Sequence, residues 1–170
     1  MIIIGIDPGN SGAFVVTDGG FLRSFPMPLL VIGKEKMIPY AGVFSLLAEL
    51  RLKYLDAQVF LERAMPMAMG SRHAFNYGRG FQTLVIAIEN LGFPYTLIEP
   101  ATWTREMHQG TNSKLKPKER SLVAVRRLFP KLVGLLPKNT KGRLLDGPVD
   151  ALLIAGYGLR ILNRKEDDFY

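Results

Sequence analysis

Residues 1–20, MIIIGIDPGNSGAFVVTDGG, decide the fold that we predict for this chain. A run of isoleucines ends at Asp7, directly before the turn sequence PGN, and indicates a buried strand over Ile2–Asp7. Two more short apolar runs, Ala13–Thr17 and Phe21–Phe25, follow after turn sequences, so the three strands are predicted to run antiparallel. A strand that buries its side chains yet ends on a carboxylate raises the question of what Asp7 does.

Beyond Phe25 the predicted elements alternate between helices and strands. The expected strands are Ala57–Glu62 and Tyr95–Glu99, and the expected helices are Pro39–Tyr54, Arg72–Leu91, Pro100–Met107, Glu119–Phe129 and Gly147–Leu162. About five strands with helices between them predict an α/β fold with a mixed sheet whose first three strands are antiparallel. We expect one globular domain over residues 1–170, with a charged, frayed tail at 163–170.

The composition excludes several classes of protein. The chain has no cysteine, which rules out disulfides, zinc–thiolate sites and cysteine nucleophiles. Its apolar runs are too short to span a bilayer, and no basic-then-apolar leader precedes the first strand, so we expect no membrane partner. The protein is therefore expected to act in the cytoplasm of a bacterial cell or a phage-infected host.

Positive charge is concentrated in one part of the chain. The net charge is +7, and eleven of the 22 Lys and Arg residues lie between Ala101 and Arg143, where the only acids are Glu106 and Glu119. Such a concentration favours a polyanionic partner such as nucleic acid, because it neutralises phosphates. A solvated, lysine-rich face is the alternative that the charge alone leaves open.

Carboxylates end two of the predicted strands. Asp7 and Glu62 lie at the C-terminal ends of strands, the edge of an α/β sheet where functional groups gather. Asp146 and Asp150 are four residues apart, so they share one face of a helix that includes Asp146. Four clustered carboxylates repel one another unless a cation joins them, and oxygen ligands without cysteine favour Mg²⁺ or Mn²⁺.

Each of these acids also has an ordinary local explanation. Asp7 suits an Asx turn before Pro-Gly, and Asp146 suits a helix N-cap. Asp150 complements a helix dipole, and Glu62 has Arg63 beside it for a surface ion pair. Only the joint occurrence of the four acids indicates a metal site.

Four segments of the chain together resemble a known family. In this order and over most of the chain, IIIGIDPGNSGA, VFLERA, KERS and DALLIAGYG resemble the RuvC-like Holliday junction resolvases, and in particular their phage and chloroplast branch. The resemblance implies an RNase H-like fold, in which a mixed sheet is flanked by helices. It also implies a homodimer that hydrolyses phosphodiesters with two metal ions.

The resemblance assigns roles to the four acids. Asp7, Glu62 and Asp150 match three metal ligands of the family. We take Asp146 as the fourth, although many bacterial relatives carry this acid at the position that is Gly147 here. These four residues would hold two Mg²⁺ or Mn²⁺ ions in each active site.

Basic residues follow from the same resemblance. A basic side chain near the start of the helix that contains KERS assists cleavage in the family, and here Lys118 is our choice, with Arg120 close behind. Met65 corresponds to the aromatic side chain that bacterial relatives insert at the junction centre, and it is interpreted either as a DNA wedge or as a packing residue. The residues expected to contact DNA are Met65, Arg72, Lys114, Lys116, Lys118, Arg120, Lys141 and Arg143.

The helix around Phe75–Leu91 resembles the dimerisation helix of the family. Gly78 and Gly80 would allow a second helix to approach closely, and a two-fold dimer would present two active sites to the two strands of a junction. Phe75 and Tyr77 are alternative stacking residues for DNA, although packing of this helix explains them as well. Trp103 is expected to anchor its short helix in the core.

We therefore predict an endonuclease that resolves four-way DNA junctions by paired symmetric nicks. A broader branched-DNA nuclease for flaps and forks is one alternative, and a non-catalytic junction-binding protein is another. GIDPGNSGA is also similar to the first phosphate loop of the sugar kinase and actin-like ATPases. That fold duplicates the domain, for which 170 residues leave no room.

Overall fold

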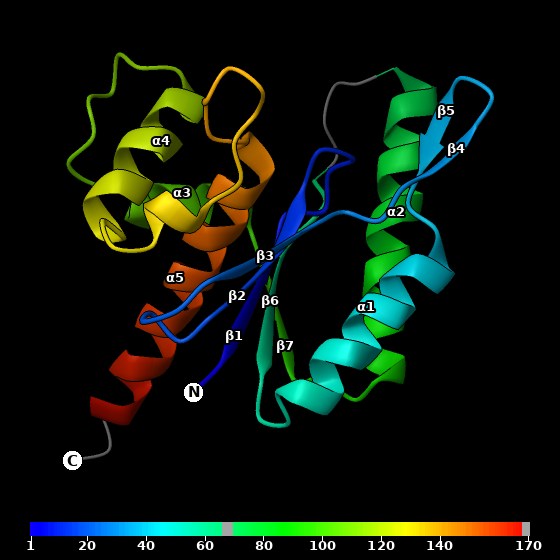
Figure 1. The fold of residues 1–170 in the computed structure, drawn as a ribbon, viewed down its shortest axis with the longest axis horizontal. Helices are drawn as coiled ribbons and strands as arrows, with labels where there is room; N and C mark the ends of the chain where they lie inside the picture. Colours follow the sequence, from blue (N-terminus) through cyan, green and yellow to red (C-terminus); the bar gives the residue numbers. More distant parts are fainter. Residues whose placement is uncertain (66–69, 168–170) are drawn as a thin grey trace.

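The computed structural model describes residues 1–65 and 70–167, with the backbone alone at 71–73 and 165–167. A five-stranded sheet forms the centre of the molecule (Figure 1), and its strands lie in the order β3-β2-β1-β6-β7. The strands are β1 (Ile3–Ile6), β2 (Ala13–Thr17), β3 (Arg23–Pro26), β6 (Gln58–Glu62) and β7 (Tyr95–Ile98). The mixed sheet that the sequence predicted is thus confirmed.

The direction of the strands follows from how they are connected. β1, β2 and β3 pair antiparallel, as their short turns predicted, whereas β6 pairs parallel with both β1 and β7. The return to a parallel neighbour requires a crossover, which helix α1 (Tyr40–Lys53) provides between β3 and β6 and helix α2 (Ser71–Asn90) provides between β6 and β7. Because β1 and β6 are parallel neighbours, their C-terminal ends meet at one edge of the sheet.

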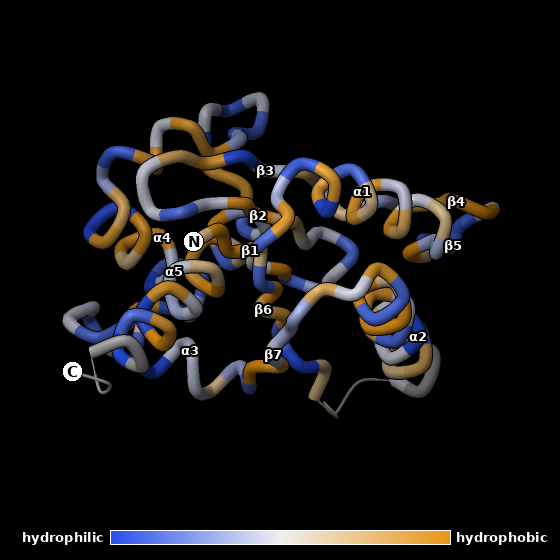
Figure 2. Tube along the Cα trace, turned by 90° about the horizontal axis from the view of Figure 1, so that it is seen from below, coloured by the Kyte–Doolittle hydropathy of each residue, from blue (hydrophilic) through white to orange (hydrophobic). Residues whose placement is uncertain are grey.

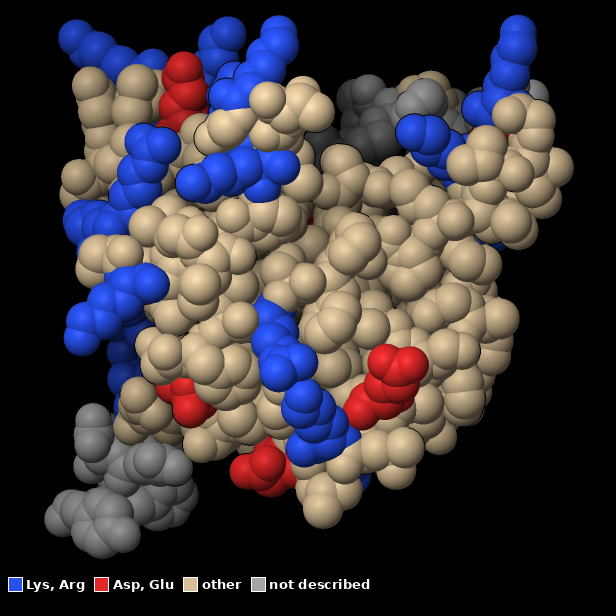
Figure 3. All heavy atoms as spheres, viewed as in Figure 1, with Lys and Arg blue, Asp and Glu red and all other residues tan. Residues whose placement is uncertain are grey.

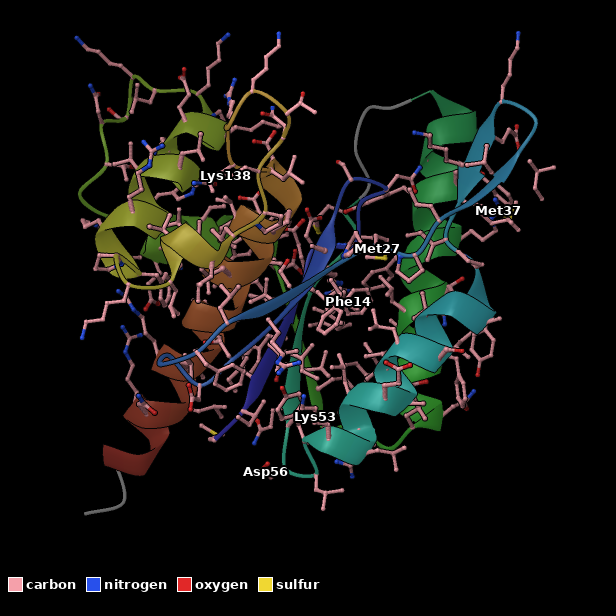
Figure 4. The ribbon with its side chains drawn as sticks, viewed as in Figure 1. Phe14, Met27, Met37, Lys53, Asp56 and Lys138 are labelled. Atoms are coloured by element: carbon pink, nitrogen blue, oxygen red, sulfur yellow. The ribbon has the colours of Figure 1, made fainter. Side chains whose placement is uncertain are left out.

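Helices cover both faces of the sheet. α1 and α2 lie on one face, and α3 (Pro100–Met107), α4 (Pro117–Leu128) and α5 (Asp146–Asp167) lie on the other (Figure 1). Alternate side chains of β1 and β2 divide between two cores: Ile4 and Phe14 pack toward α1 and α2, whereas Ile3 and Val15 pack toward α5. Figure 4 shows Phe14 in the layer between the sheet and α1.

Helix α5 lies directly on β1 because Gly5 has no side chain. A Cβ atom at Gly5 would lie 2.3 Å from the carbonyl oxygen of Ala151 and 2.6 Å from the backbone nitrogen of Ala155. Gly158, two turns from Ala151, likewise faces the ring of Phe60 on β6. The helix that carries Asp146 and Asp150 is therefore held at a fixed height above the strand that carries Asp7.

The structure adds elements that the sequence pattern did not predict. A hairpin of β4 (Leu30–Ile32) and β5 (Glu35–Met37) turns at Gly33, which has a φ of +60°. Its apolar tip is exposed (Figure 2), so no alternation between buried and exposed residues marks it in the sequence. A short 3₁₀ helix over Val133–Leu135 was also missed.

Most element boundaries differ from the prediction by one or two residues, and the end of α5 differs by five. β3 occupies Arg23–Pro26 rather than Phe21–Phe25, because Phe21 belongs to the turn where Asp18 Oδ1 accepts its backbone N–H. α5 extends to Asp167 rather than ending at Leu162, so residues 163–167 of the expected tail are helical. Residues 168–170 lie outside the described part of the chain. No helix among the described residues is long and apolar enough to cross a membrane.

Candidate active site

The parallel pairing of β1 and β6 brings the first two acids together. Ile6 is in register with Leu61, so Asp7 and Glu62, which come next in the two strands, stand side by side at the sheet edge. Asp7 also forms the Asx turn that its local sequence predicted, since its Oδ1 accepts the backbone N–H of Gly9 at 3.1 Å. The turn and the position at the sheet edge are therefore compatible functions of one side chain.

The other two acids come from the N-terminal end of α5, one turn apart. The helix includes Asp146, so Asp146 and Asp150 lie on one face of it, as their spacing predicted. Gly147 packs so tightly that a Cβ atom there would lie 2.0 Å from the carbonyl oxygen of Ser11, in the turn after Asp7. Backbone of the turn after Asp7 thus leaves no room for a side chain at position 147, and Asp146 is the acid at this end of the helix.

The buried carboxylates influence one another's pKa values. Burial, with smaller contributions from the charges of Asp7 and Asp150, raises the pKa of Glu62 to about 7, against a hydrogen bond from Trp103. Burial raises the pKa of Asp150 to about 6, to which the charges of Asp7 and Asp146 contribute. Burial also raises the pKa of Asp7, against a hydrogen bond from Gly9 and the charge of Lys118. Perturbed carboxylates that influence one another are typical of a functional site.

Lys118, rather than Arg120, is the basic side chain at these carboxylates. Its Nζ lies 2.7 Å from Asp146 Oδ2, and this contact raises the pKa of Lys118, with smaller contributions from Asp150 and Asp7. The Arg120 Nε instead donates to Thr111 Oγ1 at 3.0 Å. Arg63 is not the partner of Glu62 either, because its Nη1 lies 3.0 Å from Glu99 Oε1.

Trp103 holds Glu62 in place, a contact that the sequence did not predict. Its ring is buried, as expected for a core anchor, and its Nε1 donates a hydrogen bond of 2.6 Å to Glu62 Oε2. An indole N–H is a donor only, so this bond favours the ionised form of Glu62 and opposes the effect of burial on its pKa. The only sequence signal for this contact with Glu62 is that the single tryptophan of the chain lies in a short helix directly after a strand.

Ser121 and His108 support Asp150 in the same way. The Ser121 hydroxyl hydrogen-bonds to the Asp150 carboxylate, and His108 Nε2 lies 3.1 Å from Ser121 Oγ. A hydroxyl has one proton to donate, so when Ser121 donates it to Asp150, His108 donates through Nε2–H. Burial and the nearby Arg120 lower the pKa of His108, which favours the neutral imidazole, and in that form the chain of hydrogen bonds requires the tautomer with its proton on Nε2.

The residues present fit a divalent metal ion. Asp150 Oδ1 is buried and accepts no hydrogen bond from the described residues, a costly state that a cation would relieve. The donors are all carboxylate oxygens, the ligands that Mg²⁺ and Mn²⁺ prefer. Among the described side chains, no three of His, Cys, Asp and Glu are already drawn together as the ligands of one ion, and Lys118 partners Asp146 instead.

Basic side chains surround this site on one side. Lys and Arg side chains gather over α4 and the loop at 137–145, in the upper left of Figure 3. Of the residues expected to contact DNA, Arg120 is half-buried, and those that are exposed are Met65, Lys114, Lys116, Lys118, Lys141 and Arg143. The side chain of Arg72 lies outside the described residues. A face of this kind suits a phosphate backbone.

The two aromatic residues of α2 differ in their surroundings. Phe75 is 67% exposed, whereas Tyr77 is half-buried and lies close enough to Glu62 and Asp7 for their charges to act on it. Burial, with these charges, raises the pKa of Tyr77 to about 12, so its hydroxyl stays protonated. Tyr77 therefore places a neutral hydrogen-bond donor near the carboxylates, and Phe75 remains a surface residue.

Comparison with known proteins supports the fold at the level of structure. The chain matches no protein-family model and no curated protein sequence. Its structure, in contrast, has the fold of RuvC and of a yeast mitochondrial resolvase, the fold that its four segments implied. Three of the similar solved structures illustrate this likeness.

Two of these structures are of Thermus thermophilus RuvC. One, in complex with a Holliday junction substrate, is 18% identical with a TM-score of 0.63, and the other is 17% identical with a TM-score of 0.60. In both cases the match covers 95% of this chain and 96% of that chain. The yeast mitochondrial Holliday junction resolvase Ydc2 is 14% identical with a TM-score of 0.53, over 93% of this chain and 77% of that chain.

Proposed function

We propose that this protein is a structure-selective endonuclease that resolves four-way DNA junctions by paired symmetric nicks. The observation that supports this most directly is the meeting of four acids, Asp7, Glu62, Asp146 and Asp150, at the end of a sheet whose fold is shared with junction resolvases. The T. thermophilus RuvC structure contains a Holliday junction substrate, which makes branched DNA the first substrate to test.

We assign the hydrolysis to two divalent ions held by these four carboxylates. When bound, such ions activate a water molecule on one side of a phosphate and stabilise the leaving oxygen on the other. Asp7 and Glu62 are held by two neighbouring strands, and Trp103 and Ser121 fix the orientation of Glu62 and Asp150. In this proposal Lys118 releases Asp146 to the metal and turns its ammonium group to the scissile phosphate.

A homodimer through α2 completes the proposal. Among the described side chains of this helix, five exposed ones recur at a spacing of three to four residues, namely Phe75, Arg79, Gln82, Ile86 and Glu89, and Gly78 has open space around it. An exposed stripe with two large apolar residues supports contact with a second helix. Two copies related by a two-fold axis would then bring two sets of acids to the two strands that are cut.

The test is a nicking assay in Mg²⁺ on a four-way junction, a replication fork, a flap and a linear duplex. The wild type is compared with Asp7→Asn, which removes one metal ligand and is expected to lower cutting on the order of 10³-fold while retaining junction binding. Asp18→Asn is the matched control, since Asp18 also forms an Asx turn, in which its Oδ1 accepts the backbone N–H of Gly20. Asp18 is exposed to solvent, and its pKa is not influenced by any of the four acids.

The possible outcomes separate the candidate functions. Paired nicks on the junction, absent with Asp7→Asn and retained with Asp18→Asn, would support a resolvase. Equal cutting of flap and fork would favour a broader branched-DNA nuclease. Tight junction binding without metal-dependent cutting of any substrate would favour the non-catalytic binding protein, and undiminished cutting by Asp7→Asn would disprove the proposed site.

A further inference from the structure

We propose that a pocket beside the four carboxylates binds one unstacked nucleobase of the DNA strand that is cut, next to the scissile phosphate. This inference rests on the proposed function, because it assigns a part of the substrate to the same site. It goes further in naming the group that is recognised and the residues that recognise it.

The pocket has a volume of about 300 Å³ and lies between three segments of the chain that are distant in sequence. These are the turn between β1 and β2, the end of β3 with the linker after it, and the segment that leads from the 137–145 loop into α5. The lining residues are Asn10, Ser11, Gly12, Ser24, Pro26, Met27, Leu29, Pro137, Leu145 and Pro148. The volume is that of a small-molecule site, at the lower end of the usual range.

The chemistry of the walls selects the kind of ligand. None of the lining residues is charged, so the pocket does not suit a phosphate, a metal ion or an acidic side chain. Three prolines and the aliphatic side chains of Met27, Leu29 and Leu145 provide apolar walls. A flat heterocycle with a polar edge matches such walls, because its faces need apolar contact and only its edge needs hydrogen bonds.

Polar groups in the pocket are neutral, as recognition of a base edge requires. Asn10 and Ser11 contribute an amide and a hydroxyl from the β1–β2 turn. Ser24 Oγ is buried and has no hydrogen-bond partner among the described residues, although the residue lines the pocket. A buried hydroxyl without a partner is costly, and a ligand that brings a donor or an acceptor to this wall would satisfy it.

The pocket and the carboxylates share their supporting backbone. A Cβ atom at Gly12, which lines the pocket, would lie 2.1 Å from the carbonyl oxygen of Asp7. Pro148, another lining residue, lies in the first turn of α5 between Asp146 and Asp150. A group bound in the pocket thus lies beside the backbone that carries Asp7, Asp146 and Asp150, which makes the base next to the cut phosphate its natural occupant.

Charge complementarity also favours DNA over a protein partner. The loop at 137–145 lines the pocket with both of its ends, Pro137 and Leu145, and carries the exposed cations Lys138, Lys141 and Arg143 between them. Asn139 Oδ1 accepts the backbone N–H groups of Lys141 and Arg143, so the loop is held in a defined shape. Figure 4 labels Met27 and Lys138 on two of the three segments that border the pocket. An apolar pocket with a cationic rim suits a base whose own phosphates lie outside it.

The experiment places the fluorescent base 2-aminopurine, one position at a time, at the nucleotides that flank the cut in a four-way junction. Its fluorescence rises when it leaves the base stack, and the pocket contains no aromatic side chain to quench it. Binding of the Asp7→Asn protein in Ca²⁺, which prevents cutting, is expected to raise the fluorescence at one position beside the scissile phosphate.

Two further substitutions locate the base. Leu29→Trp in the Asp7→Asn background puts a large side chain into the pocket and is expected to abolish the rise, by excluding the base or by stacking on it. Leu30→Trp is the matched control, since Leu30 is the next residue, is also exposed and does not line the pocket. In the cutting protein, Leu29→Trp is expected to reduce the preference among nucleotides at that position by about tenfold, which corresponds to about 1.4 kcal/mol.

The outcomes keep this inference separate from the proposed function. A protein that binds and nicks junctions but raises the fluorescence at no flanking position overturns the base pocket and leaves the resolvase proposal intact. A rise of the same size with Leu29→Trp shows that the base unstacks elsewhere and also overturns the inference. A wild type that neither binds nor cuts branched DNA contradicts the proposed function itself.

Discussion

Two hydrogen bonds from neutral side chains orient the buried acids of this site. Trp103 donates to Glu62, and Ser121, which in turn contacts His108, hydrogen-bonds to Asp150. Groups of this kind add no charge of their own beside a carboxylate. They restrict the orientation of the carboxylate, and such outer contacts commonly influence metal sites strongly.

We expect Ser121→Ala to weaken metal binding and junction cutting by about 10–100-fold, because the Asp150 carboxylate loses the bond that orients it. Mn²⁺ titration of the DNA-free protein measures this directly, without relying on catalysis. Ser121→Thr keeps a hydroxyl and should restore most of the affinity, and Trp103→Phe should produce a comparable loss through Glu62. Unchanged Mn²⁺ affinity in Ser121→Ala would mean that the hydroxyl serves only packing.

The raised pKa values make the stability of the metal-free protein depend on pH. Glu62 has a pKa of about 7 when folded and 4.5 when unfolded, so the folded state retains a proton that the unfolded state releases. Stability from this source is present below about pH 4.5 and is lost as the pH rises to about 7, by on the order of 3 kcal/mol. Asp150 acts in the same direction up to about pH 6.

The measurement is urea unfolding in EDTA between pH 5 and pH 8. The free energy of unfolding of the wild type is expected to fall across this range, and Glu62→Gln should flatten the curve, since glutamine does not titrate but still accepts the Trp103 N–H. A wild-type stability that rises steadily over the same range would be incompatible with a buried, protonated Glu62.

The position of helix α5 depends on a glycine in the strand beneath it. We expect Gly5→Ala to destabilise the protein by about 1–3 kcal/mol or more, because its Cβ atom would meet backbone atoms of Ala151 and Ala155 rather than a flexible side chain. Thermal unfolding checks the stability. Junction cutting should fall as well, since α5 carries two of the acids and must move away from the strand.

Gly134→Ala is the matched control for this change. Gly134 lies in the 3₁₀ helix and has no positive φ, and a Cβ atom at its position would meet no other atom within 4 Å. Its replacement is expected to change the melting temperature little. Equal effects of the two alanines would indicate that the contact between α5 and β1 is not what limits stability.

The helices and strands show which sequence signals were sufficient to predict secondary structure. Turn sequences and apolar runs predicted the antiparallel strands correctly, and capping sequences such as Pro100 predicted where α3 begins. The hairpin Leu30–Met37 was missed because its apolar residues are exposed, with Val31 at 60%, so its pattern reflects no buried face. A local sequence pattern predicts an element when one face of that element is buried in the core, and the residues of β4 in this hairpin are all exposed.

The whole molecule is expected to act as a dimer through α2. Ile86 is 41% exposed on the helix stripe that also contains Phe75. Ile86→Glu should convert the dimer to a monomer without lowering its melting temperature by more than a few degrees, because an exposed side chain contributes little to the fold. Sedimentation measures the mass, and the junction assay should show single, unpaired nicks. A wild type that sediments as a monomer at assay concentrations would contradict the proposal.

The distribution of charge over the molecule agrees with a dimer that contacts its second copy through α2 and DNA through another side. The basic residues that are clustered in sequence between Ala101 and Arg143 are also clustered in space over α4 and the 137–145 loop (Figure 3). Exposed apolar residues lie on α2 and on the β4–β5 hairpin, and Val123, Leu135 and Leu145 are exposed on the basic side as well. The side of the molecule around α4 therefore suits phosphates, and the stripe on α2 is the surface proposed for contact with a second copy.

The sequence by itself determined the antiparallel order of the first three strands and the helical layers, because these follow from local periodicity, and it predicted the four acids from motifs that resemble a family. It also predicted the carboxylates of Asp146 and Asp150 on one helix face, since a spacing of four is a property of the helix alone. It left Lys118 and Arg120 as rivals, because both lie near the start of one helix.

Tertiary structure decided what depends on contacts between segments that are distant in the chain. It paired Lys118 with Asp146, joined Trp103 to Glu62 and placed His108 behind Ser121, none of which local spacing encodes. It also formed the pocket from three separate segments around Pro26, Pro137 and Pro148. The physical reason is the same in each case: burial and hydrogen bonding act between neighbours in space, and only the packing of α5 on the sheet makes these residues neighbours.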